Sequence, residues 1–374
     1  MRSPHRAWIE IDHSALVANL AAVRRMAAGG MQVIGVVKAN AYGHGDVAVA
    51  RTLVANGVER LAVATLPEGL GLRDAGITVP IVVLWGLGQP EAESAVAAGL
   101  EPIVYDTRGV AVIVAAAAAL GRRASVHLKV DSGLGRQGSD PAAAVEVALA
   151  IVASRHLRLL GTFSHLAAPG DDEAYTDVQL LRLAQVLDAL RSAGVDPGLV
   201  HVSATGGLLA GTAPFADAVR PGLALYGLVP PWMAGRDHGL QPVLALRALA
   251  LRIFDLPAGA SLGYGLRFRA ERATRIATLG IGYGDGWPRA HVNNGWALVR
   301  GVRVPMVGAI SMDGLTVDIG QVDGVTYDDE FVLIGEQGGE RISVDAVAAE
   351  RRTINYEVTT ALRERLPRIH LGVG

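Results

Sequence analysis

The feature that most constrains the fold is a regular alternation of short apolar runs with longer helical segments. Eight runs have the length and composition of buried strands: residues 33–37, 61–64, 81–84, 102–105, 126–130, 159–163, 199–202 and 218–219. Segments with helical spacing lie between them, among them residues 68–75, 90–98, 107–120, 142–153 and 173–193. Strands that alternate with helices predict a parallel sheet, and eight such units predict an α/β chain with a (β/α)8 TIM barrel.

The pattern changes after residue 235, where β-rich runs separated by Gly and Pro replace the long helical segments. These runs cover residues 243–254, 275–279, 297–299, 302–307, 315–318 and 331–334, and a short helix is expected near 343–350. We therefore predict a barrel domain over residues 1–235 and a mostly antiparallel C-terminal β domain over residues 236–374. The first ~10 residues are candidates to pack with the β domain.

Composition excludes several classes of protein. Apolar residues make up 51% of the 374 residues and charged residues 19%, which predicts a sizeable folded core. A net charge of -2 gives no reason to expect nucleic acid or an anionic membrane as partner. The absence of cysteine excludes thiolate metal sites and a cysteine nucleophile, and no paired metal-ligand spacing occurs.

Neither the start of the chain nor its longest apolar run predicts membrane insertion or export. Residues 1–12 contain no apolar h-region of a secretory signal. The longest apolar run, residues 109–121, is too short to span a bilayer and lies between Arg108 and Arg122. We therefore expect a cytoplasmic protein.

Lys38 stands where the first apolar run ends. Catalytic groups of a barrel come from the C-terminal ends of its strands, so this lysine would face the site. Partial burial lowers the pKa of an ammonium group, and a neutral amine can form a Schiff base. Taken alone, a lysine that caps a strand and points to solvent is the commoner interpretation, so the rest of the chain has to decide.

Polar residues follow the later strands as well. Lys129 ends the fifth run, His165 follows the sixth, Thr205 the seventh and Arg220 the eighth. Thr205 precedes two glycines at an expected helix start, which offers an anion a hydroxyl and open backbone amides. An ordinary helix cap is the alternative. Because Gly222 lies in the next loop, and barrels often bind phosphate after strands seven and eight, we predict a phosphate site.

The segment Lys38-Ala39-Asn40-Ala41-Tyr42-Gly43-His44-Gly45 resembles the pyridoxal-phosphate attachment segment of bacterial alanine racemases. The resemblance extends over residues 10–368, with further motifs in the family's order. It implies a TIM barrel followed by a β domain, with pyridoxal 5′-phosphate as cofactor. Lys38 would hold the cofactor as a Schiff base and Tyr42 would lie near its phosphate.

The resemblance assigns further barrel residues to the cofactor. Arg220 would face the pyridine nitrogen, and a guanidinium, which only donates hydrogen bonds, requires that nitrogen to be unprotonated. His165 would border the ring, and Arg136 would contact the phenolic oxygen. The lysine matching Lys129 can be carbamylated and orient that arginine. Because two bare cations repel, a carbamate, a bound anion or Asp131 must compensate.

The resemblance also supplies a second base. Racemisation needs a proton removed from one face of Cα and returned to the other. Tyr264, in Ser261-Leu262-Gly263-Tyr264-Gly265, matches the tyrosine with this role, although a tyrosine between glycines is commonly only a loop aromatic. The ordinary pKa of its phenol is ~10, so the phenol would need nearby cations such as His165 or Arg220 to lower that pKa.

The remaining matches complete the expected site. Cofactor contacts are expected from Lys38, Tyr42, Arg136, His165, Thr205, Arg220, Gly222, Leu223 and Tyr356. Substrate contacts are expected from Arg136, Tyr283, Met312 and Asp313. The sequence departs from the family pattern at Ala204, where asparagine is usual, at Ala309, where arginine is usual, and at His370, where an aromatic is common. The first two bear on cofactor affinity and substrate range.

The function that follows is pyridoxal-phosphate-dependent, two-base interconversion of L-alanine and D-alanine, supplying D-alanine for peptidoglycan. The family also implies a head-to-tail homodimer with shared active sites. A racemase of serine or of several amino acids is the nearest alternative, but such enzymes are usually exported. A basic-amino-acid decarboxylase would carry a catalytic cysteine, and a pyridoxal-phosphate carrier on a lone barrel would lack the β domain. A metal-dependent barrel hydrolase would need metal-ligand spacing.

Overall fold

The computed structural model describes residues 5–372, which contacts divide into two compact units. One unit consists of residues 16–42 and 46–240. The other combines the N-terminal segment through Ala15, residues 43–45 and the chain from Gln241 onward. The division therefore falls between Leu240 and Gln241, shortly after the predicted boundary at residue 235. Within residues 5–372, no helix has both the length and the apolar character required to span a bilayer.

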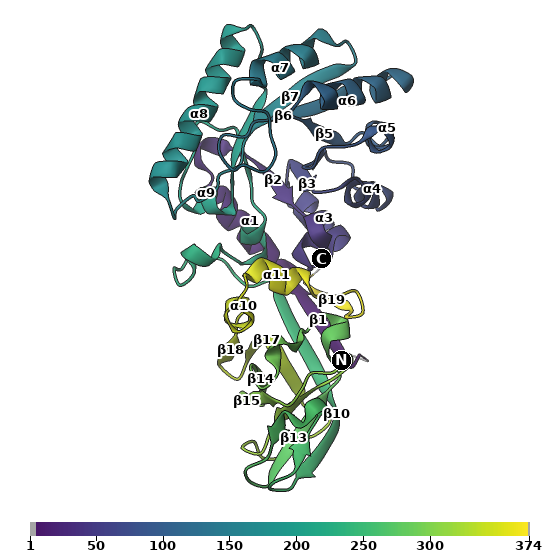
Figure 1. Ribbon diagram of the computed structural model, residues 1–374, viewed down its shortest axis with the longest axis vertical. Helices are drawn as coiled ribbons and strands as arrows, with labels where there is room; N and C mark the ends of the chain where they lie inside the picture. Colours follow the sequence, from purple (N-terminus) through teal and green to yellow (C-terminus); the bar gives the residue numbers. More distant parts are fainter. Residues whose placement is uncertain (1–4, 373–374) are drawn as a thin grey trace. The chain divides into compact units, whose positions relative to one another are not determined.

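The first unit is a closed barrel of eight parallel strands, which confirms the predicted fold (Figure 1). The strands are β2 (Gln32–Val36), β3 (Arg60–Val63), β4 (Ile81–Val83), β5 (Glu101–Val104), β6 (Ala124–Lys129), β7 (Leu157–Phe163), β8 (Leu199–Ala204) and β9 (Ala218–Arg220). They pair in sequence order, and β9 pairs with β2 to close the barrel. All C-terminal strand ends consequently open at one face.

Helices connect successive strands of the barrel. They are α3 (Asp46–Ala55), α4 (Leu66–Asp74), α5 (Gln89–Ala97), α6 (Thr107–Ala119), α7 (Ala144–Ala153), α8 (Glu173–Ser192) and the short α9 (Thr205–Leu209). The helical spacing buries one face of each, as in α6, where Val110, Ile113 and Ala117 join the core cluster of β6 residues Val126 and Leu128. The barrel thus holds its strand ends in fixed positions.

Four further helical segments belong to the barrel unit. Helix α1 (His13–Met26) begins just before the unit boundary, and its buried Asn19 donates a hydrogen bond to the Leu225 carbonyl (3.1 Å). Leu225 lies in the 3-10 helix η2 (Leu223–Tyr226), which directly follows β9. The short 3-10 helices η1 (Ala28–Gly30) and η3 (Pro231–Met233) precede β2 and follow η2.

The second unit is built on a nine-stranded sheet with the order β18-β17-β14-β15-β16-β13-β10-β1-β19. Its strands are β1 (Ala7–Asp12), β10 (Leu244–Leu256), β13 (Thr274–Leu279), β14 (Trp296–Val299), β15 (Val302–Val307), β16 (Leu315–Asp318), β17 (Glu330–Gln337), β18 (Glu340–Ile342) and β19 (Arg368–Leu371). All pairs are antiparallel except β1 with β19, so a mostly antiparallel domain is confirmed. β1 pairs with β10, which places the N-terminal strand in this sheet.

Short elements complete the second unit. The hairpin of β11 (Ser261–Leu262) and β12 (Phe268–Arg269) encloses the 3-10 helix η4 (Tyr264–Leu266). Two more 3-10 helices, η5 (Tyr283–Asp285) and η6 (Arg289–His291), follow β13. Helices α10 (Val344–Arg351) and α11 (Asn355–Thr360) precede β19. The expected helix near 343–350 corresponds to α10.

Candidate active site

Lys38 follows β2 and begins a turn of unusual handedness, α2 (Lys38–Tyr42). The four residues after the lysine, from Ala39 to Tyr42, have φ angles between 51° and 55°. A left-handed conformation disfavours residues with a Cβ by roughly 1–2 kcal/mol each and is rare beyond single positions. Backbone strain of this kind persists only where the surrounding structure holds it, and it is typical of functional sites.

Three hydrogen bonds hold the left-handed turn. The Glu68 carboxylate accepts from the Ala39 amide (2.7 Å), and the Asn40 side-chain oxygen accepts from the Asp46 amide (2.9 Å). The Ala41 amide donates to the Val37 carbonyl (2.9 Å). Ala41 and Tyr42 are buried as a result. The turn therefore fixes both the lysine and the tyrosine that the sequence singles out.

The Lys38 amine is half-buried at the C-terminal end of β2. Burial lowers its pKa, and the charges of Arg136 and Arg220 lower it further, while Glu68 acts in the opposite direction. A lowered pKa increases the fraction of neutral amine, which is the nucleophilic form. The lysine thus has the environment that Schiff-base chemistry requires.

Tyr42, Thr205 and Gly222 come together beside this lysine turn. The Thr205 Oγ1 accepts hydrogen bonds from the amides of Gly222 (3.3 Å) and Ala224 (3.1 Å). A Cβ added at Gly222 would lie 2.5 Å from the Tyr42 hydroxyl oxygen, so only glycine allows this close approach. Leu223, the next residue, is buried at the start of η2. Two hydroxyl groups and an unobstructed backbone form a cradle suited to a phosphate.

Arg220 ends β9 and is buried, with only 3% of its surface exposed. Its NH1 donates to the Nδ1 (2.9 Å) and carbonyl oxygen (2.8 Å) of His201. Its NH2 donates to the carbonyls of Ser164 (2.8 Å) and Val202 (2.9 Å) and lies 3.2 Å from the Nδ1 of His165. Burial lowers the pKa of Arg220 to about 9, which leaves the guanidinium charged at neutral pH.

His165 is neutral rather than cationic. Burial and then the charges of Arg220 and Arg136 lower its pKa well below the ordinary value. The two hydrogens of Arg220 NH2 are donated to the Ser164 and Val202 carbonyls, and His165 Nδ1 lies beside the same nitrogen as a third polar neighbour. Of the two residues expected to supply positive charge, His165 or Arg220, the lowered pKa of His165 favours Arg220.

Lys129 and Arg136 add to a cluster of cations. The buried Lys129 donates to the Gln137 side-chain oxygen (3.0 Å), and burial followed by Arg136 and Arg220 lowers its pKa to about 8. The Asp131 carboxylate accepts from the amides of Gly133 (2.9 Å) and Gly135 (3.1 Å) and so holds its own loop. The cluster favours an anionic ligand. Within residues 5–372, no group of three or more His, Asp or Glu residues could hold a metal ion.

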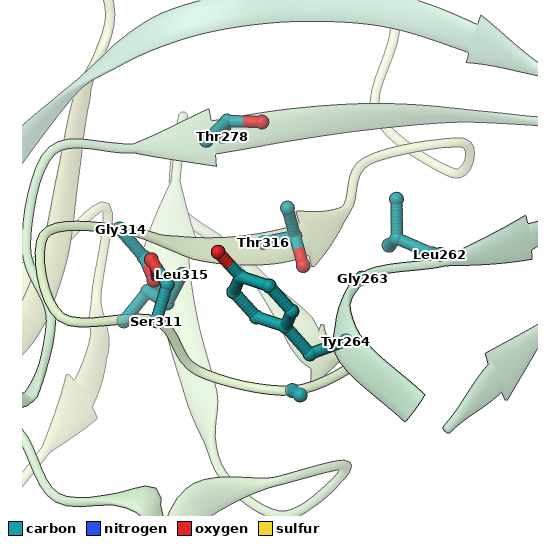
Figure 2. A pocket seen from close by; sticks show the side chains of 9 residues that line it. Leu262, Gly263, Tyr264, Thr278, Ser311, Gly314, Leu315 and Thr316 are labelled. Atoms are coloured by element: carbon teal, nitrogen blue, oxygen red, sulfur yellow. Dashed lines mark hydrogen bonds between the residues drawn. The ribbon is translucent and has the colours of Figure 1, made fainter. Parts of the chain in front are cut away.

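Tyr264 lies in η4 of the second unit and is 75% exposed. It borders a pocket of that unit lined by Leu262, Gly263, Tyr264, Thr278, Ala309, Ser311, Gly314, Leu315 and Thr316. Figure 2 shows the Tyr264 ring projecting over this pocket, with its hydroxyl on the side of Ser311 and Leu315. Ala309, one of the departures from the family pattern, lines the same pocket.

The other predicted substrate residues lie next to this pocket's Ser311. The Tyr283 amide donates to the Ser311 carbonyl (3.1 Å), and the Gly284 amide donates to the Met312 carbonyl (2.8 Å). The Asp313 carboxylate accepts a hydrogen bond from Arg365 (2.6 Å). These contacts join η5 to the Ser311–Asp313 segment. The backbone that carries Met312 is therefore well fixed.

Tyr356 lies in α11, apart from the segments above in sequence but in the same unit. Its side chain is partly buried, and burial raises the pKa of its phenol to about 12. The phenol is therefore a neutral hydrogen-bond donor at physiological pH. This is the form suited to contact a phosphate.

Sequence reasoning missed three groups that shape the site. Glu68 holds the left-handed turn and also accepts a hydrogen bond from the Thr65 amide (3.0 Å). This second bond belongs to a helix capping box, which the spacing of Thr65 and Glu68 in the sequence could have indicated. His201 binds Arg220 from within β8, and nothing in the sequence indicates this partner. The buried Tyr226 packs on Tyr42 with ring centroids 5.1 Å apart and donates to the Val36 carbonyl.

Known proteins resemble the chain over its whole length. Family models of the alanine racemase N-terminal and C-terminal domains match residues 11–230 and 243–370. The alanine racemase of Methanococcus maripaludis is 36% identical over 98% of this chain and 99% of its own. The alanine racemase structure from the D-cycloserine producer Streptomyces lavendulae has a TM-score of 0.92 and 35% identity, covering 100% of this chain and 98% of that one.

A third relative carries the cofactor. The structure of alanine racemase from Bartonella henselae with covalently bound pyridoxal phosphate has a TM-score of 0.87 and 29% identity, covering 98% of this chain and 100% of that one. Together with the two domain matches, these likenesses establish the family. The chain belongs to the alanine racemases, a family of amino-acid isomerases.

Proposed function

We propose that the protein interconverts L-alanine and D-alanine with pyridoxal 5′-phosphate and so supplies D-alanine for peptidoglycan. The observation that carries this proposal is the Lys38 amine at the end of β2, whose pKa is lowered by burial, Arg136 and Arg220. The cradle of Tyr42, Thr205 and Gly222 supports it independently.

The residues present fit this cofactor. A Cβ at Gly222 would fill the cradle, and the cations Lys129, Arg136 and Arg220 match a ligand with a phosphate and a phenolic oxygen. Lys38 would hold the aldehyde carbon, and the cradle, Leu223 and Tyr356 the phosphate. Arg136 would face the phenolic oxygen, Arg220 the ring nitrogen and His165 the ring. When bound, pyridoxal phosphate supplies a conjugated ring that withdraws electrons from the substrate α-carbon.

Two protein groups would move the proton. Lys38 would accept or return it at Nζ on one face of the α-carbon, where its lowered pKa favours the neutral amine. Tyr264 would do the same at its hydroxyl oxygen on the opposite face. Arg220, as a charged donor, would keep the ring nitrogen unprotonated, which limits electron withdrawal and favours direct return of the proton.

Arg136 would also bind the substrate, together with the backbone at Met312, Asp313 and Tyr283. The Lys129 pKa of about 8 leaves part of the amine neutral at physiological pH, and a neutral amine can combine with carbon dioxide. A carbamate at Lys129 would replace a cation by an anion and orient Arg136. Carbon-13 NMR of protein equilibrated with labelled bicarbonate tests this: the protein should give a carbamate signal, and Lys129→Arg should lose it.

We further propose a head-to-tail homodimer in which Tyr264 of one subunit completes the barrel site of the other. The residues around the proposed second base support this, because Tyr264 is 75% exposed, Leu266 68% and Met312 52%. Large exposed apolar side chains that gather around a functional residue are typical of surfaces covered by a partner.

Chiral analysis tests the reaction. L-alanine and L-serine would be incubated separately with the purified protein and pyridoxal phosphate. Fast formation of D-alanine with little D-serine is expected. Comparable D-serine would indicate a broader racemase and make Ala204 and Ala309 the first residues to test, of which Ala309 lines the pocket beside Tyr264. No D-product from either amino acid would refute the proposed reaction.

A further inference from the structure

The interior of the barrel contains a continuous polar network. TIM-barrel interiors are dominated by branched apolar side chains, whereas here several strands point ionisable groups inward. The interior network consists of Glu101 on β5, His127 on β6, His201 on β8 and Arg220 on β9. Both histidines are fully buried, and Glu101 is 7% exposed. Burying such groups is unfavourable unless each has a partner, so the arrangement calls for a reason.

Short hydrogen bonds connect the network from end to end. Arg220 NH1 lies 2.9 Å from His201 Nδ1, and His201 Nε2 lies 3.1 Å from His127 Nδ1. His127 Nε2 in turn lies 3.1 Å from a Glu101 carboxylate oxygen. Arg60 at the start of β3 donates to the same carboxylate (2.9 Å). The network therefore runs from the N-terminal strand ends to the C-terminal end of β9.

The chemistry of the two ends dictates the direction of every bond. Arg220 only donates, so His201 Nδ1 accepts and the His201 proton lies on Nε2. That proton is donated to His127 Nδ1, which places the His127 proton on Nε2 as well. Glu101 as a carboxylate only accepts, which is what His127 Nε2–H requires. Both histidines are thus neutral, and each bond in the series is satisfied.

The backbone is shaped to hold these rings. The β6–β7 register shifts between Val126 and His127, and the β8–β9 register shifts between His201 and Ala204. Such irregularities re-aim side chains and are common beside active sites. A Cβ at Gly161 would lie 2.4 Å from the Leu199 carbonyl oxygen and 2.8 Å from His127 Nδ1, so glycine allows both the approach of β8 and the position of the His127 ring.

Packing and electrostatics agree with the assigned directions. Phe163 stacks on His201 with centroids 4.5 Å apart and an interplanar angle of 9°. The Arg220 guanidinium lies 5.0 Å from the centroid of the Phe163 ring. Burial and the charge of Arg220 lower the pKa of His201 well below its ordinary value. Burial would raise the pKa of Glu101, but hydrogen bonds from His127 and Arg60 outweigh it and lower the pKa.

We propose that Glu101, His127 and His201 are positioning residues, which hold Arg220 in one orientation as a charged donor at the C-terminal end of the barrel. Each member fixes the tautomer of the next, so the carboxylate at one end determines which atom faces the guanidinium at the other. The effect on the reaction rests on the proposed function, in which Arg220 faces the cofactor ring nitrogen. The assignment of the histidine tautomers does not rest on the proposed function.

Ring-nitrogen NMR of cofactor-free protein with labelled histidine tests the geometry directly. His127→Gln and His201→Gln assign the two signals. We expect both rings to carry a single proton on Nε2 at neutral pH, as the directions of the hydrogen bonds require. A doubly protonated ring, or a proton on Nδ1 of either ring, would overturn the proposal.

Variants of the holoenzyme test the consequence. His201→Leu removes the acceptor for Arg220, and we expect kcat to fall about tenfold or more. We also expect a shift in the pH profile of the bound-cofactor absorbance. His201→Gln keeps an acceptor and should retain most of the kcat and the absorbance profile. If His201→Leu fails to fold, Glu101→Gln removes the carboxylate charge at the far end of the network with little change in shape and should shift the same profile.

The second unit provides a matched control. His291 is likewise fully buried, accepts a hydrogen bond from Arg351 (2.7 Å) and lies 3.5 Å from Glu350. His291→Leu should lower the melting temperature as His201→Leu does but leave kcat and the absorbance profile unchanged. If His201→Leu, like His291→Leu, leaves kcat and the absorbance profile unchanged, the interior network has no positioning role. If the protein does not racemise alanine, the NMR result still decides the tautomers, so the two failures are distinguishable.

Discussion

The barrel unit and the β unit present their predicted site residues in opposite ways. In the barrel, Lys38, Thr205 and Arg220 stand at strand ends and are partly or fully buried, and hydrogen bonds hold the side chains of Thr205 and Arg220. In the β unit, Tyr264 and Met312 lie on a 3-10 helix and a loop, with 75% and 52% of their surfaces exposed.

This difference suggests that the two units contribute differently to the proposed site. Buried strand ends preorganise charge, because the barrel fixes backbone and side chain together. The β-unit residues have a fixed backbone but exposed side chains, so their own unit does not fix the orientation of those side chains. The barrel is therefore expected to determine cofactor binding, and the β unit to determine how the second face of the substrate is served.

The largest effect is expected from the barrel side. Lys38→Ala removes the amine and should abolish the bound-cofactor absorbance and lower racemisation on the order of 10³-fold or more. Borohydride reduction followed by peptide mass analysis should find the cofactor on Lys38 in the parent protein. A retained absorbance band in the variant would remove Lys38 from this role.

Dimers of two different variants test whether Tyr264 of the β unit serves the site of the other subunit. Lys38→Ala and Tyr264→Phe, each nearly inactive alone, would be co-expressed with different affinity tags. If sites are shared between subunits, half of the dimers are mixed and each has one intact site, so activity should return to about a quarter. Gel filtration with light scattering would verify the dimer. No recovery in purified mixed dimers would place both residues of a site in one subunit.

A smaller effect is expected from the phosphate cradle. Gly222→Ala places a Cβ 2.5 Å from the Tyr42 hydroxyl and should weaken cofactor affinity by about tenfold or more, measured by absorbance titration. Adding Tyr42→Phe removes the closest atom of that clash and leaves the ring carbon Cζ at 2.9 Å, so the double variant should lose less than the sum of the single losses. Gly71→Ala in α4, where a Cβ meets no atom within 4 Å, should leave affinity unchanged. Equal losses at Gly222 and Gly71 would argue against the cradle.

The smallest effect is on stability. The pKa values of His165 and His201 are lowered well below 6.5 by burial and neighbouring cations. Below about pH 6.5 the unfolded chain binds protons that the folded protein excludes, so the free energy of unfolding falls as pH falls. The loss approaches about 1.4 kcal/mol per pH unit for each histidine. Urea unfolding from pH 7.5 to 5.5 should show this fall, reduced in His201→Gln; a flat profile in both would contradict it.

Much of the barrel is predictable because the spacing of apolar residues along the sequence indicates which residues are buried. The apolar run at 33–37 became β2 (Gln32–Val36), and the segment at 107–120 became α6 (Thr107–Ala119). Side chains at strand ends, such as Lys38 and Arg220, could be placed at the C-terminal face because a parallel barrel leaves no other position for them.

Other features depend on contacts distant in sequence. The left-handed conformation of Ala39 to Tyr42 contradicts local preference and requires Glu68 to hold it, so no local pattern announces it. The lowered pKa of His165 depends on burial and on four cations distant in sequence, Arg220, Arg136, Lys129 and Lys38. The pairing of β19 with β1 joins the two ends of the chain, and four residues carry too weak a pattern to predict it.

The most direct test of the central claim, that two bases serve opposite faces, is α-proton exchange in deuterium oxide by Tyr264→Phe. Exchange from L-alanine should fall more than exchange from D-alanine, because Lys38 still serves its own face. Tyr327→Phe, a tyrosine of the same unit with 54% of its surface exposed, should change neither rate. Equal losses from both enantiomers in Tyr264→Phe would contradict the two-base account.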